Sequence, residues 1–235
     1  MHKSIFFGIM LLDRGVVMRE VFNKYMNDKI KLEIWQKIGI IALIIVFTGI
    51  FGWCYEFVFY FFNGGMKKFY MQGGNFLPWI NIYMYGALMI IFLTYKFKKH
   101  PFLIFLISFI STGILEYLSG YFIYHLFDGL RLWDYNKEIL NFGNIGGFVC
   151  LRSVLFFGVS SLFLMYFMLP FCIYLSLKIP KKYFLIFSIL LCSIFLFDEV
   201  YNLIIARILN LPRASDVYKS MGFSYVGSIL RLLYL

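Results

Sequence analysis

Four acidic residues lie within strongly apolar stretches of this sequence, namely Glu56, Glu116, Asp198 and Glu199. A charged side chain inside a lipid bilayer is energetically costly, so an acid there usually faces a partner, a water-filled cavity or a ligand. Such carboxyl groups can bind cations, relay protons or act as general acids and bases. The simpler alternative is a hydrogen bond that holds two helices together. These residues are therefore the first candidates for a functional site.

Three of these acids are expected at a similar depth in the membrane. Each of Glu56, Glu116 and Asp198 follows the start of its apolar stretch by 15 to 18 residues, and a helix rises about 1.5 Å per residue. Because the three stretches are expected to cross in the same direction, these acids should lie in the outer half of the bilayer. Glu199 is expected on a different face of its helix from Asp198. Arg152, at the start of another apolar stretch, is a cation that could pair with one of the acids.

Two connections rich in glycine, asparagine and aromatic residues complete the expected site. They cover residues 71–86 and 132–151. Glycine and asparagine favour tight turns, and tryptophan and tyrosine are typical of a membrane interface. The sequence predicts a polar pocket that opens to the outer face beneath these connections. Its expected lining residues are Trp53, Glu56, Tyr83, Glu116, Trp133, Asp134, Tyr135, Asn144, Arg152 and Asp198.

Several other chemistries lack a sequence signal. The chain has no nucleophile triad, no metal-ligand spacing and no phosphate-binding loop of the Walker A type. Its four cysteines form no CxxC pair and lie in or beside apolar stretches, which is typical of buried thiols. We therefore assign no catalytic residue, no metal and no cofactor, and whether the chain is an enzyme stays open, with the negative answer favoured.

The elements that must position these residues are membrane helices. The chain is 62% hydrophobic and only 14% charged over 235 residues, whereas a soluble domain is about 25% charged. A span needs about 20 apolar residues, and helices satisfy their own backbone groups in lipid. The sequence predicts an all-α, polytopic integral membrane helix bundle of about five transmembrane helices. The expected spans are 38–62, 79–95, 101–126, 148–177 and 183–205, with Pro170 able to bend the fourth.

The distribution of charge predicts the orientation and the division of the chain. Residues 1–37 are expected to be a cytoplasmic or interfacial leader, residues 38–206 the transmembrane bundle, and residues 207–235 an interfacial tail. Lysine and arginine are concentrated before the first span and in the second and fourth connections, which predicts a cytoplasmic N-terminus. The net charge of +10 is therefore read as a topology signal, and no nucleic-acid partner is expected.

Five short motifs follow one another across roughly residues 45–200. They are Gly52 to Glu56, Phe69 to Leu88, Leu115 to Tyr117, Leu132 to Tyr135 and Asn144 to Leu151. Together they resemble a bacterial membrane protein family described as putative ABC-transporter type IV (CmpB-like), and the resemblance implies a bacterial plasma-membrane location. The chain departs from the family pattern at Asn81, Met84, Tyr124, Asn136 and Phe148.

Three functions are compatible with these observations. The first is a permease-like subunit of a transport system, in which a separate ATPase subunit or an ion gradient supplies the energy, and in which a chain this small is expected to form a homo-oligomer within the lipid bilayer. The second is a membrane-embedded enzyme that acts on a lipid or lipid-linked substrate through Glu56, Glu116 and Asp134. The third is an assembly or sensory protein without chemistry. We favour the first.

Overall fold

The computed structural model describes residues 18–63, 70–72, 74–126, 128–129, 131, 133–222 and 224–226. Helices dominate these residues, and the expectations for the start of the leader and the end of the tail lie outside them. Residues 18–26 form the first described helix. The main helices after it are α2 (Ile34–Asn63), α3 (Asn81–Thr94), α4 (Pro101–Leu126), α5 (Leu151–Phe163), α6 (Leu169–Lys178) and α7 (Lys181–Val200).

Four helical segments among the described residues are long and apolar enough to cross a membrane. They cover Ile34–Phe62, Pro101–Leu126, Leu151–Lys178 and Lys181–Ile208. Large apolar side chains stay exposed along them, for example Phe102 and Phe122 on α4, as expected for surfaces that lipid covers. The predicted all-α membrane bundle is confirmed.

The fourth predicted span remains one continuous helix despite its proline. Between α5 and α6 the chain forms a π-helical turn, Leu164–Met168, and the N–H of Leu169 bonds to the carbonyl of Leu164, five residues earlier. Pro170 follows directly and has no N–H to donate. The wider turn therefore accommodates the proline without ending the helix. A second π-helical turn, Tyr201–Ile205, extends α7 into the short helix α8, Ala206–Ile208.

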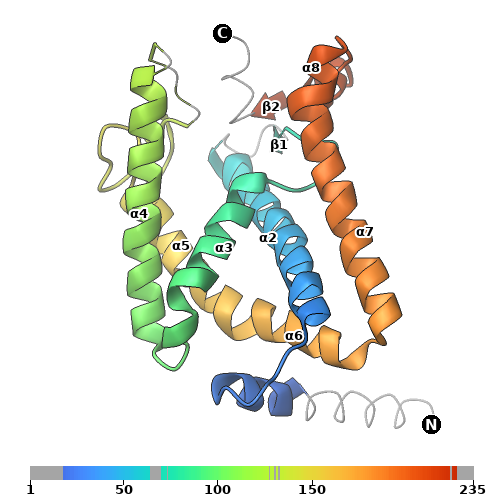
Figure 1. Cartoon of the computed structure of the whole chain (residues 1–235). Helices are drawn as coiled ribbons and strands as arrows, with labels where there is room; N and C mark the ends of the chain where they lie inside the picture. The colour runs from blue at the N-terminus through green and yellow to red at the C-terminus, as the bar shows by residue number, and fades with distance from the viewer. Residues whose placement is uncertain are drawn as a thin grey trace, which may run out of the picture.

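The second predicted span differs from the expectation. Helix α3 has 14 residues, or about 21 Å of length, which is less than the hydrocarbon core of about 30 Å. Residues 74–80 precede it as non-helical chain, and the N–H of Ile80 donates to the carbonyl of Gly49 at 3.0 Å, midway along α2. This non-helical segment, residues 74–80, runs from the β1 end of the bundle past α7 to the start of α3, and α3 then continues to the opposite end (Figure 1). Helix α3 therefore lies within the predicted span 79–95, but it is too short to cross the hydrocarbon core as a helix alone.

The connections gather at two ends of the bundle. The helix over residues 18–26 lies at the same end as the α3–α4 and α6–α7 turns (Figure 1). Its Tyr25 is buried, and Asp28 pairs there with the buried Lys98. At the other end, β1 (Tyr70–Gln72) pairs in parallel with β2 (Ser224–Val226). This grouping of connections agrees with the charge pattern, while the side that each end faces and the domain division stay predictions.

Candidate functional site

The membrane acids fall into two separate groups. Asp198 and Glu199 on α7 are buried, with 5% and 8% of their surface exposed, and they bond to the non-helical segment and to the start of α3. Glu56 on α2 and Glu116 on α4 are only partly buried and lie beside the connection between α4 and α5. The two groups therefore have different surroundings, although the same residue type in the same kind of helix defines both.

Asp198 binds the backbone of the non-helical segment. Its carboxylate accepts the N–H groups of Phe76 at 3.0 Å and Leu77 at 2.9 Å, and the indole N–H of Trp79 at 3.1 Å. Non-helical backbone at membrane depth requires such partners, because lipid offers none. Asp198, expected as a pocket residue, thus has its acceptor sites occupied by the protein itself.

Glu199 binds the same stretch of chain as its neighbour. The amide of Asn75 donates to Oε1 at 2.5 Å, and the amide of Asn81 donates to Oε2 at 2.9 Å. Asp198 and Glu199, which the sequence placed on different faces of their helix, therefore both bond to the chain between residues 75 and 81. The two side chains diverge from the helix, but the chain from residue 75 to residue 81 reaches both of them.

The C-terminal part of the described chain packs over Asp198 and the non-helical segment. Asn202 donates to Oδ1 of Asp198 at 2.8 Å and accepts the N–H of Ala214 at 2.8 Å. Ala214 begins helix α9, Ala214–Ser220. Tyr218 on that helix donates its hydroxyl to the carbonyl of Phe76 at 2.6 Å. One hydrogen-bond network thus joins α9, α7 and the non-helical segment.

The second group begins where α2 and α3 approach closely. Tyr83 donates its hydroxyl to Glu56 at 3.2 Å. A Cβ at Gly52, one turn earlier on α2, would collide with the ring of Tyr83. Glycine at this position therefore allows α3 to come near enough for the Tyr83–Glu56 hydrogen bond.

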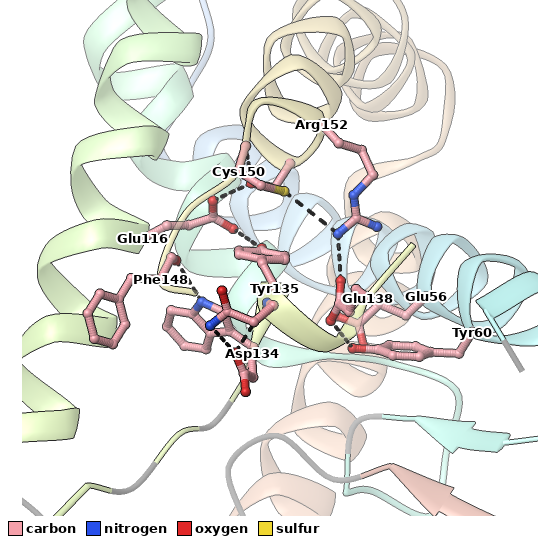
Figure 2. A network of polar contacts seen from close by, with 12 residues as sticks. Glu56, Tyr60, Glu116, Asp134, Tyr135, Glu138, Phe148, Cys150 and Arg152 are labelled. Atoms are coloured by element: carbon pink, nitrogen blue, oxygen red, sulfur yellow. Dashed lines mark hydrogen bonds and ion pairs between the residues drawn. The ribbon is translucent and has the colours of Figure 1, made fainter. Parts of the chain in front are cut away.

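Glu116 receives two hydroxyl groups. Tyr135 donates to Oε1 at 2.7 Å, and Ser153 at the start of α5 donates to Oε2 at 2.7 Å. Figure 2 shows the Tyr135 ring between α4 and the neighbouring ion pair. Tyr135, which the sequence placed in the pocket, is buried and lies in the short helix Tyr135–Lys137. Ser153 was not anticipated, because a single serine in an apolar run gives no signal.

Arg152 pairs with a carboxylate that the sequence interpretation overlooked. Its Nη2 lies 2.6 Å from Oε2 of Glu138, and both side chains are nearly buried, at 12% and 9% exposure. Tyr60 on α2 donates to the same carboxylate at 3.1 Å. The expectation that Arg152 pairs with a membrane acid is corrected, because the connection before α5 supplies its own acid.

Burial and charge act against each other at Glu138. Desolvation raises the pKa of this carboxyl, while the Arg152 guanidinium and the hydrogen bonds from Arg152 and Tyr60 lower it; the net direction is upward. The ion pair therefore compensates only part of the cost of burying this carboxylate.

Asp134 and Asn144 stabilise the loop between α4 and α5. Asp134 accepts the N–H of Asn136 at 3.2 Å and its amide at 2.8 Å. Asn144 donates to Asn136 at 2.7 Å and accepts the N–H of Gly147 at 2.8 Å. Gly147 has φ +81°, which favours glycine, and a Cβ there would meet the side chain of Arg131. Partial burial raises the pKa of Asp134, but the hydrogen bonds from Asn136 and the charges of Lys137 and Arg131 outweigh it and lower this pKa.

The two tryptophans of the predicted pocket lie apart from its acids. Trp133 donates its indole N–H to the carbonyl of Phe148 at 2.8 Å and so belongs to the loop. Trp53 stacks on Phe57 with ring centroids 5.1 Å apart. Its buried indole N–H has no hydrogen-bond partner among the described residues. Neither side chain contributes a hydrogen bond to Glu56 or Glu116 in the described part of the chain.

The remaining polar side chains come from several helices and from the α4–α5 connection. We define the acid cluster as Glu56, Tyr83, Glu116, Tyr135, Glu138, Arg152 and Ser153, contributed by α2, α3, α4, the α4–α5 connection and α5 (Figure 2). With every group ionised its three carboxylates and one guanidinium carry a charge of −2. No set of three metal-ligating residues is found among the described residues. The net negative charge of the cluster suits it to accept hydrogen bonds or positive charge.

Fold and site together define a polytopic membrane protein with a non-helical segment inside the bundle and buried acids. The model of the family described as putative ABC-transporter type IV matches residues 43–203. The chain belongs to this family, a membrane family linked by its description to transport, as the sequence motifs indicated. Comparison with curated proteins and with solved structures gave no match.

Proposed function

We propose that this protein is a permease-like membrane subunit of a transport system and that the acid cluster binds the transported ligand. The family description supports the class. The observation that carries the site is the arrangement of charge: Arg152 pairs with Glu138, while Glu56 and Glu116 accept hydrogen bonds from hydroxyl groups. Two partly accessible acids whose hydrogen bonds come from neutral groups favour a ligand with donors or positive charge.

The energy for transport is expected from another chain. The sequence contains no Walker A motif, so ATP hydrolysis by that route needs a separate ATPase subunit. The described bundle is small for alternating access, and homo-oligomerisation within the bilayer is part of the proposal. We place the acid cluster at the outer end of a bacterial plasma-membrane protein, following the lysine and arginine distribution.

Purification from native membranes in mild detergent tests the transport role. We expect an ATP-binding subunit to co-purify in a fixed ratio, identified by mass spectrometry and by ATPase activity in the complex. Recovery of the chain without such a subunit, under conditions that preserve other membrane complexes, contradicts an ATPase-driven permease.

Matched variants test the acid cluster. Glu56→Gln and Glu116→Gln keep the side-chain shape and remove the negative charge, so mass spectrometry of co-purified small molecules should show a ligand lost from both variants. Glu20→Gln is the control, because Glu20 lies 61% exposed and pairs with Lys24 one turn away. Equal ligand retention in all three variants contradicts a role for the cluster in binding.

A further inference from the structure

Positive charge is concentrated at one end of the bundle without matching acids. This is the end that holds the first described helix and the α3–α4 and α6–α7 turns (Figure 1). Its described segments, residues 18–37, 96–100 and 178–182, contain eleven lysines and arginines but three acids. Glu20 and Asp28 pair with lysines, and Glu33 accepts an indole N–H. Most of the positive charge at this end therefore has no acid to offset it.

Three of these lysines lie together at the α6–α7 turn, and we call Lys178, Lys181 and Lys182 the lysine turn. Lys178 ends α6 and Lys181 begins α7, with Ile179 and Pro180 between them. All three lysines are exposed, and none forms an ion pair with another described residue. A topology signal needs such charges only somewhere in the connection, whereas neighbouring like charges repel one another unless an anion lies among them. The lysine turn therefore favours an anionic ligand.

An aromatic ring and a row of exposed apolar side chains indicate the depth of the lysine turn. Nζ of Lys181 lies 5.5 Å from the ring centroid of Trp35 on α2, and tryptophan is typical of the membrane interface. Along α7 the exposed side chains of Tyr183, Ile186 and Leu190 follow the turn at the three- and four-residue spacing of one helix face. The lysines therefore lie at headgroup level, at the start of a surface that suits hydrocarbon.

We propose that the lysine turn binds the headgroup of an anionic phospholipid. The phosphate lies among the three ammonium groups, and the acyl chains run along the exposed face of α7. The charge selects the headgroup, because lysine clusters beside a membrane helix attract anionic lipids. The apolar face selects a lipid over a soluble anion, because only a lipid covers both the lysines and this face. This inference goes beyond the transport role and does not depend on it.

Native mass spectrometry of the purified full chain in a neutral detergent tests this proposal. Phosphatidylglycerol and phosphatidylcholine with the same acyl chains are added, so that the two probes differ in the net charge of the headgroup. We expect phosphatidylglycerol to bind about tenfold more tightly, with a preference that falls as the ionic strength rises. Equal binding of the two lipids overturns the proposal.

Glycerol 3-phosphate separates a lipid from a soluble anion. This probe carries a phosphate group but no acyl chain. We expect it to leave bound phosphatidylglycerol in place, because it cannot cover the apolar face of α7. Displacement of the lipid by glycerol 3-phosphate at a similar concentration shows that the turn binds soluble phosphates, and it overturns the assignment to a lipid.

Two variants of equal charge test the location of the headgroup. Replacement of all three residues of the lysine turn by glutamine should lower the preference for phosphatidylglycerol about tenfold. The control removes three exposed lysines at the opposite side of the same end, in and beside the α3–α4 turn (Figure 1), and should keep the preference. Equal loss in both variants overturns the proposal, because it shows that the whole end attracts the lipid. The control substitutions are Lys29→Gln, Lys96→Gln and Lys99→Gln.

An arginine variant distinguishes lost charge from lost structure. Replacement of the lysine turn by three arginines keeps the positive charge, so the preference for phosphatidylglycerol should remain. Thermal unfolding in the same detergent shows whether each variant is folded, and each single glutamine variant should lose part of the preference if the triple glutamine variant unfolds. An arginine variant that unfolds as the wild type does but binds both lipids equally overturns the proposal.

Discussion

The acid pair of α7 and the acids of α2 and α4 both lie in apolar helices, but they differ in what donates to them. Asp198 and Glu199 are buried and accept backbone N–H, indole and amide groups of the chain from residue 75 to residue 81. Glu56 and Glu116 are partly exposed and accept hydrogen bonds from the hydroxyl groups of Tyr83, Tyr135 and Ser153.

This difference separates structural acids from candidate ligand-binding acids. An acid that satisfies several buried donors cannot release them without exposing unpaired groups. An acid bound by a tyrosine or serine hydroxyl can exchange that donor for a ligand, because a hydroxyl rotates and can find another acceptor. The partners of a membrane acid therefore say more about its role than its depth does.

The largest expected effect comes from removing Asp198. Asp198→Ala leaves the N–H groups of Phe76 and Leu77 and the indole of Trp79 without their acceptor. We expect a loss of roughly 3–5 kcal/mol in the free energy of unfolding, measured by thermal unfolding in mild detergent. Glu20→Ala, on the exposed face of the first described helix, should change it by less than about 0.5 kcal/mol. A tolerant Asp198→Ala contradicts the anchoring role.

Breaking the ion pair in the acid cluster should have the next largest effect. Glu138→Leu leaves Arg152 nearly buried without its carboxylate, which we expect to cost about 2 kcal/mol after allowance for partial exposure. The double variant Glu138→Leu, Arg152→Leu should recover much of this loss, because no unpaired charge remains. A double-mutant cycle from unfolding measurements tests this, and strictly additive losses argue against direct coupling.

The candidate ligand acids should tolerate neutralisation. Glu56→Gln retains an oxygen that accepts the Tyr83 hydroxyl. Glu116→Gln retains one oxygen for one of its two hydroxyl donors, and its new amide N–H can donate to the oxygen of the other, so we expect changes in unfolding free energy within about 1 kcal/mol for each variant. Ligand binding, measured as in the tests above, should nevertheless fall at least tenfold. Destabilisation comparable to that of Asp198→Ala places these acids in the structural class and removes the contrast.

The smallest expected effect is a pH dependence in the loop. Because the pKa of Asp134 is lowered by folding from its usual 3.8, its ionised form stabilises the loop above that value, and the contribution is lost as the pH falls through the folded pKa. Unfolding of the wild type and of Asp134→Asn is compared at pH 5 and pH 3. The wild type should lose more stability over this interval than the variant, and equal losses contradict the loop role.

The sequence was sufficient to predict the long helices and the residue types of the site. Apolar length alone identifies the segments now seen as α2, α4, α5–α6 and α7, since membrane thickness dictates how long such runs must be. The same reasoning located α3 but not the chain before it, because residues 79 and 80 are apolar but not helical. Hydropathy records which atoms avoid water, and it cannot tell a helical crossing from an extended segment whose backbone is bonded to Asp198.

Pairing within the acid cluster was beyond sequence reasoning for a related reason. Glu138 and Arg152 are 14 residues apart, and the loop between them folds back through turns at Gly143, Gly146 and Gly147, all with positive φ. The glycines indicated turns, but not which charge they return to the helix. Ser153 and Tyr60 gave no signal because single hydroxyl groups are common in membrane helices.

The distance along the chain between the non-helical segment and the acids that bind it, Asp198 and Glu199, has a consequence for the order of synthesis. The side-chain bonds that reach Glu199 and Asp198 span 118 to 124 residues of sequence. At about 5–20 residues per second, α7 is completed roughly 6–25 s after the segment leaves the ribosome. During that interval the segment's N–H groups need water, lipid headgroups or the insertion machinery as partners. The chain between α2 and α3 therefore reaches its final position only after α7 has been made.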